Sequence, residues 1–440
     1  MEAAENATPR EITASGLDFL SLHPFVRQTV LDRIRGAVFG AALGDAVGLY
    51  TEFLSRDMSL AAYPEGRFQL GTWTDDTDHA LLIILSYLHY DGKKLSPLDF
   101  AHRLRFWCEQ GLRCLDRLPL GLGRTIGSIV TDRNYLNDPK ATAYNYWVKG
   151  KYHAAPNGSL MRAYPLGILC LEKAVEITFH TAAEYSVVTH ADPRCVVSCC
   201  LVTGLIRGLL RGQVFTESDV DAFIPQCLSW VDQWIEERSS KEGNVGDPRL
   251  DHEEFYRHLK VKRFDELQLD DAMTMGYVYK TLGAAILCLR LALRHSSGST
   301  TTEMSRSAAK FPNAFENLLT TLILQGGDAD TNACVAGALL GALMGFNSLP
   351  SHWRDGLAHS QWLLNKCDAL ISVTKVNNET LPYKGSEDPD TSLDGGKGVL
   401  TREELEAREK AFVHAYMARL HLGRDQPEKG WLKKLLKHAQ

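Results

Sequence analysis

Apolar residues recur along most of the chain at the three- and four-residue spacing that is typical of α-helices. Stretches with the alternating apolar and polar pattern of β-strands are scarce, and no hairpin signal joins them. The pattern therefore predicts an all-α fold. The predicted helices span residues 25–47, 80–89, 97–110, 160–174, 193–211, 219–237, 272–294, 314–324 and 331–344.

The helical segments between residues 25 and 370 follow one another without a linker that would divide them. We therefore expect a single compact multi-helix domain over residues 25–370, preceded by a tail over residues 1–24. A Ser/Thr-rich stretch at 295–311 is expected to be an inserted loop. Residues 371–400 are polar and are predicted to form a linker or loop, and residues 401–440 a helical C-terminal tail.

Four glycines stand at four-residue intervals in the first predicted helix: Gly36, Gly40, Gly44 and Gly48. This spacing places all four on one face of the helix, where a second backbone could approach closely. The glycines alone indicate tight helix packing and do not imply a catalytic or binding role.

The charge balance limits the partners. The chain has 48 Lys and Arg residues against 54 Asp and Glu residues, a formal net charge of −6. No global basic field is available to hold a nucleic-acid backbone or an anionic membrane, so we expect neither strong nucleic-acid binding nor membrane association. A polyanionic ligand would need local amides, metals or arginines.

The first twenty residues contain Glu2, Glu5, Glu11 and Asp18 and lack the apolar run of a secretory signal. The longest apolar stretch, 333–346, is too short to cross a bilayer. None of the ten cysteines forms a Cys-x-x-Cys pair, which favours reduced thiols. We therefore expect a cytoplasmic protein, with the nucleus as the alternative.

Two acidic clusters share one arrangement: Thr74-Asp75-Asp76-Thr77-Asp78 and Asp328-Ala329-Asp330-Thr331-Asn332 each precede an apolar helical run. Asp and Thr are favoured at helix N-termini, so each cluster alone could be a plain helix cap. As a pair, they offer the hard oxygen ligands that suit magnesium, manganese or calcium. If they meet across the bundle, they could hold two ions.

Three further segments could face an anionic substrate. Gly121, Gly123 and Thr125 lie in a glycine-bearing turn whose amides suit a pyrophosphate. Residues 157–162 form a polar turn before another helical run, and His190 stands at the start of the next. A lone histidine at a helix start could equally be structural.

In order along the chain, these segments resemble the ADP-ribosylglycohydrolase family. The landmarks are Gly36 to Ala46 followed by Glu52, then Trp73 to Thr77, Asn157 to Arg162, Thr189-His190 and Gly326 to Thr331. The resemblance implies an all-α fold with a binuclear metal cleft. It also implies a hydrolase that cleaves an ADP-ribose derivative at the anomeric carbon of the distal ribose and releases ADP-ribose.

Residue by residue, the resemblance implies two Mg²⁺ ions, with Mn²⁺ as the alternative, and six ligands: Thr74, Asp75, Asp76, Asp328, Asp330 and Thr331. It assigns catalytic roles to Glu52 and Asp328. We expect substrate contacts from Gly121, Gly123, Thr125, Asn157, Gly158, Ser159, Met161 and His190.

The sequence does not identify the acceptor group attached to ADP-ribose, because such a metal centre holds the sugar and not the acceptor. The partner is an ADP-ribose-containing small molecule or an ADP-ribosylated macromolecule, and we expect a monomer. One alternative is a phosphatase or esterase acting on ADP-ribose-1″-phosphate or O-acetyl-ADP-ribose, and another is a non-catalytic ADP-ribose-binding protein. The sequence departs from some family members at residues 151–156, which lack a glycine-rich approach, and at Asn332, which replaces an apolar residue.

Overall fold

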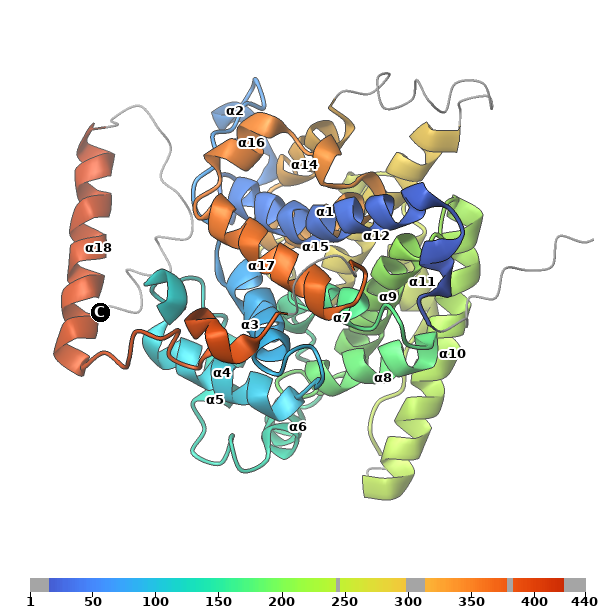
Figure 1. Cartoon of the computed structure of the whole chain (residues 1–440), viewed down its shortest axis with the longest axis horizontal. Coiled ribbons are helices and arrows are strands. Elements are labelled where there is room, and N and C mark those ends of the chain that lie inside the picture. The colour runs from blue at the N-terminus through green and yellow to red at the C-terminus, as the bar shows by residue number, and fades with distance from the viewer. Residues whose placement is uncertain (1–15, 243–245, 298–312, 378–382, 423–440) are drawn as a thin grey trace, which may run out of the picture.

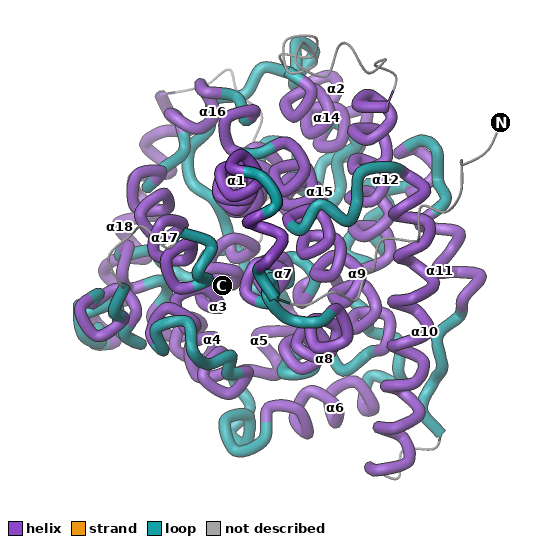
Figure 2. The backbone as a smooth tube through the Cα atoms, turned by 45° about the vertical axis from the view of Figure 1, so that its right-hand side comes forward, coloured by secondary structure: helices purple, strands orange, loops and turns teal. Residues whose placement is uncertain are grey.

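A computed structural model of the chain describes residues 16–242, 246–297, 313–377 and 383–422. Within these residues the chain forms helices joined by loops, and the β-type pairings are two isolated bridges, Leu112 with Arg117 and Pro156 with Tyr277. Figure 2 shows the same arrangement, with helices packed on one another from all sides. The predicted all-α fold is confirmed.

Two helices form the centre of the fold, α1 (Pro24–Gly48) and α15 (Ala329–Met344), and they run antiparallel (Figure 1). The glycines of α1 face the backbone of α15: a Cβ atom at Gly40 would lie 2.2 Å from the Gly337 carbonyl oxygen. A Cβ atom at Gly48 would lie 2.3 Å from Asp330 Cα. Larger residues would push the helices apart, so the glycine spacing brings the end of α1 to the start of α15.

The other helices surround this pair. They are α2 (Arg56–Ala62), α3 (Asp75–His89), α4 (Pro97–Gln110), α5 (Arg124–Val130), α6 (Pro139–Lys149), α7 (Tyr164–Leu169), α8 (Val175–Ser186), α9 (Pro193–Leu210), α10 (Glu217–Glu242), α11 (His252–Leu259), α12 (Val278–Ser297), α14 (Ala314–Ile323), α16 (Ser351–Gly356), α17 (Ser360–Val373) and α18 (Arg402–Leu422). Short 3-10 turns lie at Asp18–Ser21, Arg113–Leu115, Asn157–Ser159, Phe264–Leu267, Phe346–Ser348, Gly385–Glu387 and Pro389–Thr391.

Helix α9 is long and apolar enough to cross a membrane by length and composition alone. However, 94% of it is buried inside the fold, which is the environment of a core helix.

Most predicted helices match observed ones, but two were predicted too long. Only Tyr164–Leu169 of the 160–174 prediction is α-helical, and the helix predicted from residue 272 begins at Val278. Before Val278 the Asp271 carboxylate accepts a hydrogen bond from the Met273 amide, at 3.1 Å, and closes a turn. The prediction missed α2, α5, α6, α8, α11, α16 and α17. Helix α6 does carry a start signal, because Asp138 caps it by accepting from the Ala141 amide at 2.9 Å.

The segment after α17 packs on the helical body. Arg103 on α4 donates to the Thr391 carbonyl at 2.8 Å, and the Gly385 amide donates to Asp91 at 2.8 Å. Helix α18 stands at one edge of the molecule (Figure 1), where Arg408 pairs with Asp116 at 2.8 Å. Most of the predicted Ser/Thr-rich insertion, the first part of the N-terminal tail and the chain after residue 422 lie outside the described residues.

Candidate metal centre and substrate cleft

The two acidic clusters, far apart in sequence, meet at one cleft. The first forms the start of α3 and the second the start of α15. A cleft of about 240 Å³, called the polar cleft below, lies between them. Its lining includes Glu52, Asp75, Asp76, Gly121, Gly123, Thr125, Asn157, Gly158, Met161, His190, Gly276, Asp328, Asp330 and Thr331.

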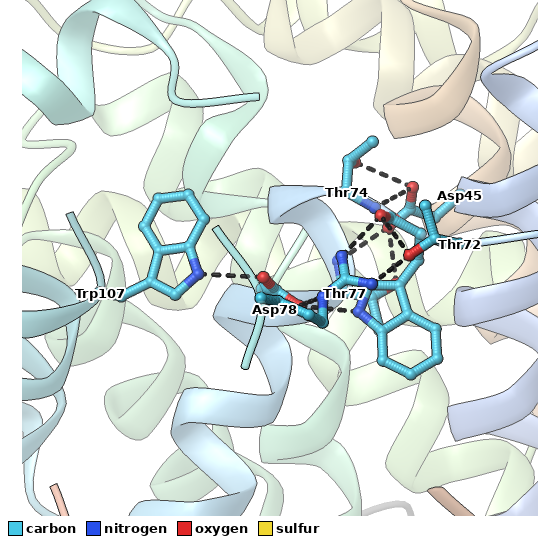
Figure 3. Close-up of polar contacts among 8 residues, drawn as sticks. Asp45, Thr72, Thr74, Thr77, Asp78 and Trp107 are labelled. Carbon is cyan, nitrogen blue, oxygen red and sulfur yellow. Dashed lines mark hydrogen bonds and ion pairs between the residues drawn. The ribbon is translucent and has the colours of Figure 1, made fainter. Parts of the chain in front are cut away.

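Asp45 on α1 joins the clusters, although the sequence analysis gave it no role. Its carboxylate accepts from the Thr74 amide at 2.9 Å and the Thr77 amide at 3.0 Å (Figure 3). It also lies 2.8 Å and 2.6 Å from the two threonine hydroxyls. Asp45 thereby caps α3 from another helix. The available signal was a single carboxylate within an apolar, glycine-rich helix.

Three buried carboxylates converge: Asp45, Asp76 and Asp330 each place an oxygen so that the three atoms lie within 4.8 Å of one another. Burial, and then the charges of Asp45 and Asp328, hold the pKa of Asp76 well above its usual range. Burial, and then the charges of Glu52 and Asp76, do the same for the pKa of Asp330. Such a group is stable in its charged form only with a cation to offset the repulsion.

One oxygen of the Asp76 carboxylate also lacks a positive partner in the part of the chain that the structure describes. Among the described residues, no hydrogen-bond donor contacts Asp76 Oδ1, although the atom is buried. Buried carboxylate oxygens are normally satisfied by donors or metals. The carboxylates and hydroxyls around it are hard oxygen donors, so the residues present fit Mg²⁺ or Mn²⁺.

Asp78, in the same cluster as Asp76, does not face the cleft. It accepts from the indole nitrogens of Trp73 at 2.7 Å and Trp107 at 3.0 Å (Figure 3). The Arg117 guanidinium lies 3.3 Å from it. These donors satisfy the carboxylate, so Asp78 holds the surrounding segments together and has no free oxygen for a metal.

Glu52 lies on the loop after α1 and is 6% exposed. It lines the polar cleft beside Asp330. Two backbone hydrogen bonds tie this loop to the second cluster, from the Phe53 amide to Gly327 at 2.6 Å and from the Gly327 amide to Leu54 at 2.9 Å. Gly327 has φ +72°, and a Cβ atom there would lie 1.9 Å from the Leu269 carbonyl oxygen, so only glycine fits.

Three glycines were predicted to contact substrate, Gly121, Gly123 and Gly158, and Gly121 is the most constrained of them. Its φ is +92°, and a Cβ atom would lie 2.1 Å from Asp75 Oδ1. Gly123 also lines the cleft, but no atom lies within 4 Å of the position of its Cβ. A side chain at Gly121 would therefore displace Asp75, whereas one at Gly123 would enter open space.

His190 lines the cleft, and its neighbours determine which nitrogen carries the proton. Arg162 donates to the Thr189 hydroxyl at 2.5 Å, and that hydroxyl lies 2.7 Å from His190 Nδ1. Among the described residues the Thr189 proton has no acceptor except Nδ1. Burial and the Arg162 charge keep the pKa of His190 well below its usual value, so the ring is neutral. The proton is then on Nε2, which has no protein partner among the described residues.

The family of the chain follows from comparison with known proteins. The family model for ADP-ribosylglycohydrolase matches residues 26–380. The chain belongs to the ADP-ribosylglycohydrolase family. It is similar to ADP-ribosylarginine hydrolase Tri1 of Serratia proteamaculans, with 26% identity over 350 residues that cover 78% of this chain and 79% of that protein. It is also similar to ADP-ribosylhydrolase ARH3 of Homo sapiens, with 27% identity over 359 residues, 74% of this chain and 89% of that protein.

The predicted family membership is thus confirmed, and the chain is a hydrolase of the ADP-ribosylglycohydrolase type. All but one of the six side chains that the resemblance implies as metal ligands line the polar cleft. The exception is Thr74, which lines an adjoining cavity and is bonded to Asp45.

Asn332 supports the second cluster indirectly. It accepts from the Thr281 hydroxyl at 2.7 Å. The Asn157 amide donates to Thr281 and to Asp328 Oδ2, each at 3.0 Å. These hydrogen bonds hold the Asp328 carboxylate in place. Although Asn157 lines the cleft, its side-chain amide already donates to Thr281 and Asp328.

Ser159 was also expected to contact substrate, but it is not among the residues that line the polar cleft. Its hydroxyl lies behind the cleft wall, 3.1 Å from Ser186 Oγ and 3.5 Å from Cys199 Sγ. The 3-10 turn Asn157–Ser159 sends successive side chains in different directions, which the linear motif did not reveal.

Proposed function

We propose that this ADP-ribosylglycohydrolase is magnesium-dependent and hydrolyses the bond between the anomeric carbon of the distal ribose and its acceptor, releasing free ADP-ribose. The observation that carries the proposal is the convergence of Asp45, Asp76 and Asp330 within 4.8 Å, with Asp76 and Asp330 lining one cleft together with Glu52. The names of the relatives, an ADP-ribosylarginine hydrolase and an ADP-ribosylhydrolase, support the same substrate class.

In this proposal two Mg²⁺ ions, or Mn²⁺ in their place, are held by Thr74, Asp75, Asp76, Asp328, Asp330 and Thr331. Asp45 orients Thr74 and adds negative charge behind the ligands. When bound, the ions would polarise the sugar oxygens and make a nearby water more acidic. Asn157 would keep the Asp328 carboxylate aimed at the site.

Glu52 would act on water. It would accept a proton from the water that attacks the anomeric carbon, and Asp328 in the same cleft would help to orient that water. The water oxygen bonds to carbon, the carbon–acceptor bond breaks, and the acceptor atom takes the proton. The backbone bonds that tie the Glu52 loop to Gly327 would keep this carboxylate near Asp330.

The polar cleft would also bind the pyrophosphate. His190 would donate from Nε2 to a phosphate oxygen, and Gly121, Gly123 and Thr125 would present the start of α5 to it. Gly158 and Met161 would form the adjoining wall.

The test is a panel of substrates that carry ADP-ribose on serine, on arginine and on nucleic acid, together with O-acetyl-ADP-ribose and ADP-ribose-1″-phosphate. We expect magnesium-dependent release of free ADP-ribose from at least one of them. Tight ADP-ribose binding by wild type with no turnover across the panel would contradict the proposed hydrolysis and favour a binding protein.

A further inference from the structure

A second cavity, of about 510 Å³, adjoins the polar cleft and is called the apolar cavity below. The two share Glu52, Gly121, Gly123, Arg124 and Asp330, so they meet at the carboxylates. The sugar bond that Glu52 and Asp330 would serve therefore lies at a junction, with one space for each side of that bond.

The two spaces differ in chemistry. The polar cleft contains His190, Asn157 and most of the acidic residues. Every residue that lines the apolar cavity alone is uncharged, and its walls include Leu49, Trp73, Pro119, Leu120 and Leu122. Its charged residues, Glu52, Asp330 and Arg124, are all shared with the polar cleft.

One wall of the apolar cavity is held firmly. Arg117 donates to the Trp73 carbonyl at 2.7 Å, bonds the Thr72 hydroxyl, and stacks on the Trp73 ring with its guanidinium carbon 4.9 Å from the ring centre. The Asp78 carboxylate accepts a hydrogen bond from the Trp73 indole nitrogen at 2.7 Å. The wall is therefore formed before a ligand arrives, which lowers the entropic cost of binding.

We propose that the apolar cavity binds the leaving group, and that this group is an uncharged acceptor with an aliphatic or aromatic body. The inference rests on the proposed hydrolysis and specifies its substrate class. The volume lies within the roughly 300–1,000 Å³ range of small-ligand sites. An arginine guanidinium bound in this cavity would lose its hydration, and the walls beyond the junction carry no carboxylate to compensate. The cationic Arg124, which lies at the junction, would also repel it.

The experiment compares two matched ADP-ribosyl substrates that differ only in the alcohol joined to the anomeric carbon, benzyl alcohol in one and methanol in the other. We expect wild type to favour the benzyl substrate in kcat/KM by about tenfold or more, the range for apolar groups in a matching pocket. Benzyl alcohol alone should also bind wild type already saturated with ADP-ribose, as seen by ligand-observed NMR.

The cavity itself is tested by Gly127→Leu on α5. A Cβ atom there makes only ordinary contact with Leu122, at 3.4 Å, and leucine favours a helix more than glycine does, so the variant should fold. The longer side chain would fill the cavity, and the benzyl-to-methyl preference should fall about tenfold. Gly246→Leu, where no atom lies within 4 Å, is the matched control and should keep the wild-type preference.

The outcomes separate this inference from the proposed hydrolysis. Wild type that cleaves both substrates without preference, or that cleaves an arginine-linked substrate faster than the benzyl one, overturns the inference and leaves the hydrolysis standing. Competition between benzyl alcohol and ADP-ribose would assign the cavity to the nucleotide and also overturn it. Wild type that cleaves neither these substrates nor the wider panel defeats the hydrolysis itself.

Discussion

Asp76 and Asp78 lie two residues apart at the start of α3, and their surroundings are opposite. Asp78 receives two indole N–H groups and the Arg117 guanidinium. Asp76 faces Asp45 and Asp330 and has one oxygen without a donor among the described residues. A carboxylate that receives hydrogen bonds from enough donors stabilises the fold, whereas a carboxylate placed among like charges needs a cation.

The largest expected effect is on turnover when the charge-repelled group loses a member. Asp330→Ala and Asp76→Asn should each bring turnover below detection, because each removes a ligand of the proposed centre. Without metal, neither should lower the melting temperature, since both relieve repulsion between buried carboxylates. Thermal unfolding in EDTA checks the second point, and a clear destabilisation would place these residues in the supporting structure.

The next effect concerns Glu52. Glu52→Gln should lower kcat by about a hundredfold or more, as expected for the loss of a positioned proton acceptor. ADP-ribose affinity should change little, because the phosphates and metals provide most of that binding. Single-turnover rates and calorimetry separate the two quantities, and an unchanged rate on every accepted substrate would remove Glu52 from the mechanism.

Asp78 should show the reverse pattern, with a loss of stability. Asp78→Ala leaves the Arg117 charge and two buried indole donors without a partner, which should lower the unfolding free energy by about 3–5 kcal/mol. Chemical denaturation measures this change. The fraction that stays folded should keep its response to magnesium, and a loss of metal binding equal to that of Asp76→Asn would show that the two residues have one role.

Magnesium should stabilise the protein more as pH rises. The pKa values of Asp76 and Asp330 are raised in the fold, so without metal the folded state binds more protons than the unfolded state. Its stability then falls as pH rises through the interval between the unfolded and folded pKa values. Magnesium binds the ionised carboxylates and so offsets this loss of stability. At a magnesium concentration of a hundred times its Kd, the unfolding free energy should rise by about 2.7 kcal/mol. Melting curves over a pH series check the direction.

The smallest expected effect concerns His190. Thr189→Val removes the hydroxyl that directs the His190 proton to Nε2, and ADP-ribose affinity should fall about tenfold, the value of a typical hydrogen bond. Thr189→Ser retains the hydroxyl and should behave as wild type. Nitrogen-15 NMR of the histidines reports the tautomer directly, and an Nε2 proton retained in the valine variant would contradict the assignment.

Much of the site could be predicted because its signals are local. Both clusters stand beside the helix starts that they form, and the glycine spacing indicated a close helix contact. The role of Asp45 could not be predicted, because it depends on α1 lying against α15 and reaching the Thr74 amide.

Other features of the site depend on the direction in which side chains point in the fold, which the spacing of residues in the sequence does not show. Ser159 and Asn157 belong to one short motif, yet only Asn157 reaches the cleft. The apolar cavity unites Leu49, Trp73 and Leu122 from three separate segments, and no local pattern marks them as neighbours.

The proposed role of the acidic cleft is that of a metal centre for hydrolysis. The most direct measurement is the release of ADP-ribose by EDTA-treated wild type, followed as magnesium is added back, on any substrate that the untreated protein cleaves. We predict no release in EDTA and recovery that saturates with magnesium, in parallel with the rise in melting temperature. Full activity in EDTA, with no response to added magnesium, would contradict the account.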